Sequence, residues 1–171
     1  MKNSSKGFSL IELLIVVAII LIIAAIAIPN LLRSRIAANQ ASAVGSLRTL
    51  NTAEITYSST YNVGFSATLG YLGPPAPNVS PTSTAAGLID SVLSGTVTTA
   101  QAGAMGSAKS GYSFTYSPGL SDTTGHINAY QFQAQPITSS TGTNYYFTDA
   151  SGVIRQNSTA VALSTDSPIA G

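Results

Sequence analysis

The stretch KGFSLIELLIVVAIILIIAAIAIPN, residues 6–30, determines most of the fold. Every residue from Leu13 to Ile28 is apolar. As a helix rising about 1.5 Å per residue, the 21 residues from Phe8 to Ile28 would be about 31 Å long, close to the hydrocarbon thickness of a bilayer. A helix in a soluble core does not need apolar residues on every face over such a length. The sequence therefore predicts a helix that meets lipid.

Glu12 lies near the start of this apolar stretch. A carboxylate inside a spanning helix costs on the order of 2.5–3.5 kcal/mol, and less near the interface, so a carboxylate in such a place usually has a partner. The one nearby cation in the sequence is Lys6. A plain membrane anchor would therefore explain the length of the stretch but not Glu12.

A cleaved secretory signal is a second alternative. Lys2 and Lys6 supply a positive start, and residues 25–27 (Ala-Ile-Ala) resemble a cleavage site for small residues. The apolar run is longer than the roughly 7–15 residues of such signals, and Glu12 interrupts its beginning. Both features disfavour this interpretation.

The heptapeptide KGFSLIE, residues 6–12, closely resembles the signal of type IV pilins and type II secretion pseudopilins. The resemblance implies that a prepilin peptidase cuts between Gly7 and Phe8 and then N-methylates Phe8. Residues 1–7 would be the cleaved leader, and residues 8–28 would remain as the transmembrane and filament-core helix. It further implies that the new amine of Phe8 meets Glu12 of a neighbouring subunit, which would neutralise a carboxylate in an apolar filament core.

Residues 29–57 are predicted to continue the helix as an amphipathic half. Pro29 removes a backbone donor and crowds the preceding turn, so we expect a kink there. Apolar positions then recur at steps of three, four or seven: Leu32, Ile36, Ala43, Leu47, Leu50 and Tyr57. One helix is therefore expected from about Phe8 to about Tyr57.

Residues 58–110 are interpreted as a connector, rich in proline and glycine over its first half. A short second helix is predicted from Ser83 to Leu93, ended by Gly95.

Residues 111–171 are predicted to form an antiparallel sheet and a tail. Aromatic residues alternate with small polar residues over 112–117, and with glutamines over 130–135, which is typical of strands with one buried face. Further strand signals at 145–148 and 153–155 flank a turn, so three or four strands are expected. The amphipathic half of the helix is the one large apolar stripe available to cover them. The predicted fold class is α+β, similar to the pilin fold, with residues 157–171 as a loosely attached tail.

Few residues suggest catalysis or ligand binding. The chain has a single histidine, His126, and its six acidic residues are dispersed. Asp149 or Asp166 could supply one calcium ligand, but the number of carboxylates is small for a site with 6–8 oxygen ligands. Without cysteine the chain has no disulfide or thiolate metal site, and its net charge of +1 gives no basis for binding nucleic acid. We therefore predict no catalytic residue, no metal and no cofactor.

The resemblance, together with these observations, implies a structural subunit of a type IV pilus. By the resemblance, it is a single-pass protein of the bacterial inner membrane, N-terminus inside and C-terminus outside, before it joins the extracellular filament. Its expected partners are copies of itself, the prepilin peptidase and methyltransferase, the inner-membrane pilus assembly machinery and the lipid bilayer. The alternatives are a type II secretion pseudopilin and, from another class, a membrane-anchored or secreted binding domain or enzyme. Motility, adhesion, DNA uptake and electron transfer all stay open as roles of the fibre.

Overall fold

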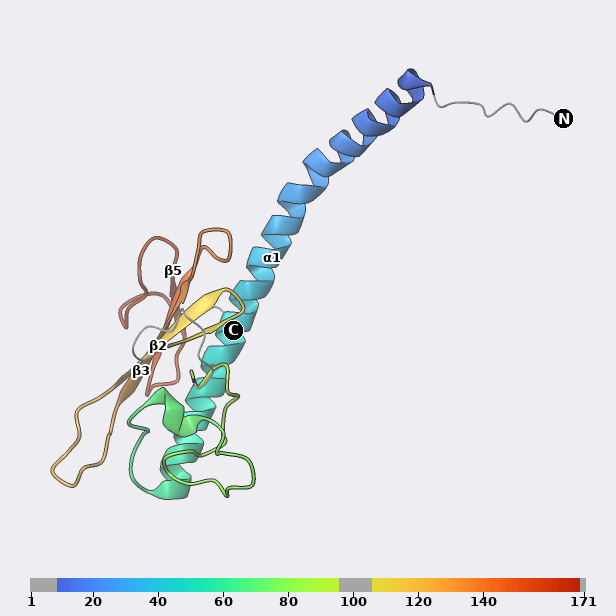
Figure 1. Ribbon diagram of the computed structural model, residues 1–171. Coiled ribbons are helices and arrows are strands. Elements are labelled where there is room, and N and C mark those ends of the chain that lie inside the picture. The colour runs from blue at the N-terminus through green and yellow to red at the C-terminus, as the bar shows by residue number, and fades with distance from the viewer. Residues whose placement is uncertain (1–8, 96–105, 170–171) are drawn as a thin grey trace. The chain divides into compact units, whose positions relative to one another are not determined.

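A computed structural model describes residues 9–95 and 106–169 (Figure 1). The chain divides into two compact units, residues 1–35 and 36–171. Helix α1 (Leu10–Tyr61) contributes residues to both units. The predicted leader, residues 1–7, lies outside the described residues, as does Phe8.

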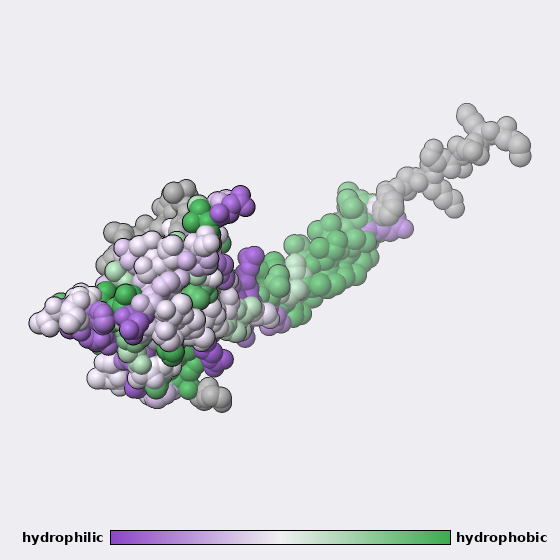
Figure 2. Space-filling view, turned by 90° about the horizontal axis from the view of Figure 1, so that it is seen from below, coloured by the Kyte–Doolittle hydropathy of each residue, from purple (hydrophilic) through white to green (hydrophobic). Residues whose placement is uncertain are grey.

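The part of α1 in the first unit is apolar on all sides from Leu13 to Ile28. Every large apolar side chain from Leu10 to Leu32 is exposed, and Figure 2 shows the hydrophobic surface that they form. Within the described part of the chain, α1 is the one helix long and apolar enough to cross a membrane. The helix continues through Pro29, although proline has no N–H to donate to the preceding turn. A bend at Pro29 stays a prediction.

The part of α1 in the second unit is amphipathic, as the sequence predicts. Its buried apolar residues recur at steps of three or four: Ala43, Leu47, Leu50, Ala53 and Tyr57. The helix ends at Tyr61, four residues later than expected, because Asn62 adopts a left-handed conformation (φ 52°) that stops the helix.

An antiparallel sheet forms the rest of this unit, and the α+β fold class is confirmed. Its five strands follow chain order across the sheet: β1 (Gly106–Lys109), β2 (Tyr112–Pro118), β3 (Tyr130–Pro136), β4 (Tyr145–Asp149) and β5 (Arg155–Asn157) (Figure 1). The aromatic residues of β2 and β3 lie in one buried cluster with the apolar face of α1. The rings of Tyr116 and Phe132, for example, are 4.9 Å apart between centroids.

The five strands exceed the three or four expected. The additional strand is β1, whose sequence Gly-Ser-Ala-Lys has none of the β-branched or aromatic residues that indicate a strand. A two-residue turn creates it instead: Ser110 (φ 51°) and Gly111 (φ 75°) are both left-handed, as a type I′ hairpin requires. This turn pairs Lys109 with Tyr112 and so sets the register of β1 on β2.

The predicted helix from Ser83 to Leu93 is wrong. Among the described residues of the connector, the helical element is a short 3₁₀ helix, η1 (Leu69–Leu72). The backbone N–H groups of Ala86 and Leu88 donate to the carbonyls of Tyr71 and Leu72, both at 2.8 Å. Gly87 between them is left-handed (φ 67°), which a helix does not accommodate. Long-range backbone pairing therefore replaces the local helix.

The expectation of a loosely attached tail at residues 157–171 is also wrong for residues 157–169, which the structure describes. Ala162 is completely buried. Asp166 accepts hydrogen bonds from the Leu163 backbone (2.8 Å) and the Asn157 amide (3.1 Å), and the Ile169 N–H donates to the Ile154 carbonyl. One aspartate thus organises a segment without any periodic pattern.

Candidate functional site

The carboxylate of Glu12 is bound by the first turn of its own helix. The backbone N–H of Ser9 donates to Oε2 of Glu12 at 2.9 Å. Ser9 directly precedes α1 and Glu12 is the third helical residue, so the pair forms half of a capping box. An anion is also favoured at a helix N-terminus, where unpaired N–H groups carry partial positive charge. Oε1 has no hydrogen-bond partner among the described residues.

Sequence reasoning missed the contribution of Ser9. The signal was present, because Ser-x-x-Glu before an apolar run is the sequence pattern of a capping box. Glu12 consequently needs less from another molecule than expected: Oε2 is bound to Ser9, and among the described residues Oε1 alone is left without a hydrogen bond. Gly7 and Phe8 lie outside the described residues, so leader cleavage, methylation and the pairing of Phe8 with Glu12 stay predictions.

A second glutamate, Glu54, is completely buried in the core of the second unit. The backbone N–H of Ser66 donates to its Oε2 (2.9 Å), and the hydroxyl of Ser66 donates to its Oε1 (2.7 Å). Burial raises the pKa of Glu54, and the two hydrogen bonds from Ser66 offset part of that rise. The pair fixes the start of the connector to α1.

Tyrosine hydroxyls, rather than cations, surround Glu54. Tyr116 donates to the carbonyl of Ser66 at 2.6 Å, and burial together with the nearby Glu54 raises the pKa of Tyr116. The one ion pair among the described residues joins Lys109 to Asp90, at 2.7 Å. Neutral donors therefore stabilise the carboxylate of Glu54, and the arrangement is that of a structural anchor.

The remaining acidic residues also bind groups of their own loops. Thr124, Asn128 and the His126 backbone donate to Asp122 in the β2–β3 loop, and these hydrogen bonds hold the pKa of Asp122 well below its usual range. Asp166 organises the C-terminal segment, as described above. Among the described residues, no three histidine, cysteine or acidic side chains gather as a metal site would require.

Comparison with known proteins places these features in a class. Residues 2–28 match the family described as "prokaryotic N-terminal methylation motif". The chain is thus a protein with a methylation-type N-terminal segment, a membrane-compatible helix and an α+β second unit.

Relatives in this N-terminal region are type IV pilins. The chain is 49% identical to the type IV major pilin protein PilA of Myxococcus xanthus over 55 residues, 32% of this chain and 25% of that protein. It is 67% identical to the type IV wide pilus major component PilA4 of Thermus thermophilus over 39 residues, 23% of this chain and 29% of that protein. The matches thus span between a quarter and a third of these relatives. No solved structure matches the chain. By its motif and these relatives, the N-terminal segment is similar to that of type IV major pilins.

Proposed function

We propose that this protein is a structural subunit of a type IV pilus-type filament and polymerises through the N-terminal part of α1. The observation that carries the proposal is the exposed and wholly apolar surface of residues 13–28, within the matched methylation motif of residues 2–28. A soluble monomer rarely exposes an apolar patch of this extent. Lipid can cover it before assembly, and the same segment of neighbouring subunits can cover it afterwards.

Processing prepares this segment for assembly. Cleavage between Gly7 and Phe8 creates an α-amino group, which is then N-methylated and stays cationic. In the filament this cation pairs with Glu12 of a neighbouring subunit. The geometry of Glu12 supports the pairing, since Oε2 is bound to Ser9 while no residue that the structure describes bonds to Oε1. The pair sets the register between subunits because an unpaired charge in an apolar core is costly.

A location and a set of partners follow for the protein if it is such a subunit. Before assembly, the protein resides in the inner membrane as a single-pass protein with its N-terminus inside. The inner-membrane assembly machinery then moves it into the extracellular fibre. The prepilin peptidase and methyltransferase are its processing partners. As a structural subunit, it is expected to perform no reaction of its own.

Amino-terminal sequencing and intact-mass measurement of sheared fibres test the proposal. The expected mature chain begins at N-methylated Phe8. A chain that begins at Met1, or at Ile28 as a secretory signal would leave it, contradicts the proposal.

Deletion of the gene separates the two kinds of filament. Loss of long surface fibres is expected from a pilus subunit. A protein-secretion defect without any loss of fibres would instead indicate a type II secretion pseudopilin.

A further inference from the structure

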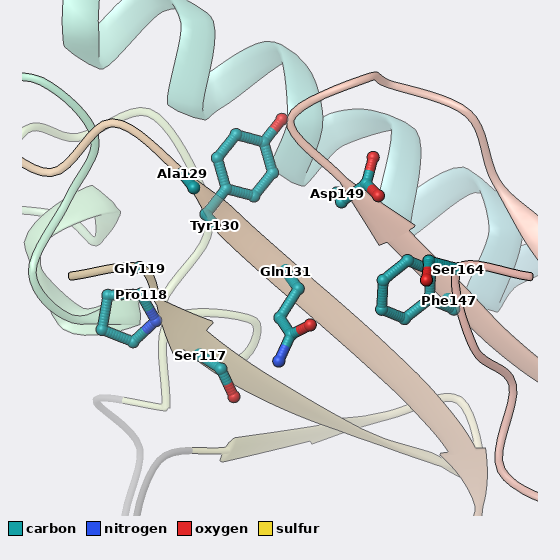
Figure 3. A pocket seen from close by; sticks show the side chains of 9 residues that line it. All are labelled: Ser117, Pro118, Gly119, Ala129, Tyr130, Gln131, Phe147, Asp149 and Ser164. Atoms are coloured by element: carbon teal, nitrogen blue, oxygen red, sulfur yellow. The ribbon is translucent and has the colours of Figure 1, made fainter.

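A pocket of about 400 Å³ lies where β2, β3 and β4 meet the C-terminal segment (Figure 3). A volume of this size is sufficient for a small ligand. The lining residues all belong to the second unit: Ser117, Pro118, Gly119, Ala129, Tyr130, Gln131, Phe147, Asp149 and Ser164.

The sheet register fixes the polar side of this pocket. Gln131 on β3 is paired with Ser117 on β2 and with Asp149 on β4, so the three residues form one row across the sheet. Figure 3 shows Gln131 at the centre of the group, between Ser117 on one side and Phe147 and Ser164 on the other. Three of the polar groups thus stand on strands, which hold them more precisely than a loop would.

These polar groups have unused hydrogen-bonding capacity. Among the described residues, none bonds to the Gln131 amide, the Ser117 hydroxyl or the Ser164 hydroxyl. The carboxylate of Asp149 accepts a hydrogen bond from the Ser151 N–H through Oδ1 (2.9 Å), while no residue in the described part of the chain bonds to Oδ2. Phe147, which is 4% exposed, supplies an apolar floor.

This combination selects a class of ligand. None of the nine lining residues is basic, so the pocket does not suit a phosphate or a carboxylate. A single carboxylate is too little for a calcium ion, which takes about 6–8 oxygen ligands. An apolar ligand would desolvate four polar groups without replacing their hydrogen bonds. A neutral sugar fits, because adjacent hydroxyls both donate and accept while the C–H face of the ring is apolar.

We propose that this pocket binds one unit of a neutral carbohydrate. The sugar hydroxyls donate to Oδ2 of Asp149 and exchange hydrogen bonds with the Gln131 amide, and Ser117 and Ser164 complete the contact. The site lies within one subunit, so binding does not require a filament.

Nuclear magnetic resonance titration of the full chain in micelles tests the proposal. The detergent must lack a sugar headgroup; lauryldimethylamine oxide is suitable. The probes are maltotetraose, cellotetraose and chitotetraose, with calcium chloride in a separate titration. At least one sugar should saturate with a Kd on the order of 1 mM, because so open a site holds few contacts. The shifted amides should be those of Ser117, Gln131, Asp149 and Ser164.

Two variants and one control sharpen the experiment. Gln131→Ala should weaken sugar binding at least about tenfold, the effect of losing a hydrogen-bonding anchor from a small site. Asp149→Asn keeps the acceptor for Ser151 and should weaken binding several-fold. Gln135→Ala, an exposed glutamine on the same strand outside the pocket, should leave binding unchanged.

Four results would overturn the carbohydrate site. They are the absence of a saturable shift with every sugar, shifts located away from the pocket, equal losses in Gln131→Ala and Gln135→Ala, and saturation of the pocket by calcium alone. Shifts that grow with protein concentration in the absence of sugar would instead identify the pocket as a contact between copies of the chain.

Discussion

Helix α1 carries one glutamate in each of its two parts, and the two are stabilised in different ways. Glu54 is completely buried, and both of its oxygens accept hydrogen bonds from Ser66 of the same chain. Glu12 is exposed on an apolar segment, and within residues 9–95 and 106–169 only one of its oxygens accepts a hydrogen bond. The carboxylate of Glu54 therefore has its hydrogen-bonding partners within the fold, whereas that of Glu12 retains binding capacity for another molecule.

The largest effect is expected from Glu12→Ala. If the free oxygen of Glu12 pairs with a neighbouring subunit, its removal should reduce filaments at least about a hundredfold, because the charge left on the partner amine is costly in an apolar core. Sheared fibres measured by immunoblot and electron microscopy give the result. The amount of subunit in the membrane is the control, and it should stay unchanged. Normal fibre yield and symmetry in this variant would contradict the assembly role that distinguishes Glu12 from Glu54.

Glu54→Ala should act on stability rather than on assembly contacts. It leaves the buried N–H of Ser66 unsatisfied and leaves its hydroxyl only the longer hydrogen bond to the Tyr116 hydroxyl (3.3 Å), which we expect to cost about 2 kcal/mol in the free energy of unfolding. Urea unfolding of the full chain in micelles, followed by tyrosine fluorescence because the chain has no tryptophan, measures the change. Glu12→Ala is the matched control and should leave this transition in place. Equal destabilisation by both variants would show that the two carboxylates do not differ as described.

Variants of Ser9 distinguish the roles of the two carboxylate oxygens of Glu12. Ser9→Pro removes the backbone N–H that binds Oε2, whereas Ser9→Ala keeps it. We expect Ser9→Pro to lower filament yield several-fold, since loss of a capping interaction costs about 1 kcal/mol, and Ser9→Ala to lower it less. Fibre yield should be compared at equal amounts of cleaved subunit, since Ser9 lies two residues from the predicted cut. Identical yields for the two variants would assign no assembly role to the N–H.

The smallest expected effect is a change in the free energy of unfolding with pH. The pKa of Glu54 is raised above its ordinary value of 4.5, so the folded state holds this proton more tightly than the unfolded state does. Its contribution to stability is full below pH 4.5 and is lost as the pH rises through the folded pKa. The pKa of Asp122 is lowered from 3.8, so its contribution is instead lost in more acidic solution, as the pH falls below 3.8. In the Glu54→Gln variant, the urea concentration at the unfolding midpoint should depend less on pH above pH 4.5. An unchanged pH dependence would exclude Glu54 as the group that causes it.

The elements that the sequence predicted well are those with a strong local pattern. The length of the apolar stretch predicted the membrane-compatible helix, and alternating aromatics predicted β2 and β3. Elements formed by distant pairing were missed. Strand β1 exists because of a tight turn and its pairing with β2, and residues 83–93 follow the carbonyls of Tyr71 and Leu72 rather than their own helical pattern.

The candidate sites follow the same division. Glu12 was visible from sequence because a charge within an apolar run is conspicuous, and the Ser9 pattern beside it was readable but missed. The burial of Glu54 could not be read in the same way, because its donors belong to Ser66, twelve residues later, after the end of α1. The sugar pocket depends on strand register and on the placement of Ser164, neither of which a local pattern encodes.

The C-terminal segment, closed by hydrogen bonds to Asp166, has a consequence for biogenesis. The chain contains no cysteine, so this closure requires neither an oxidant nor an enzyme that exchanges thiols. The second unit can consequently fold equally well in reducing and in oxidising surroundings.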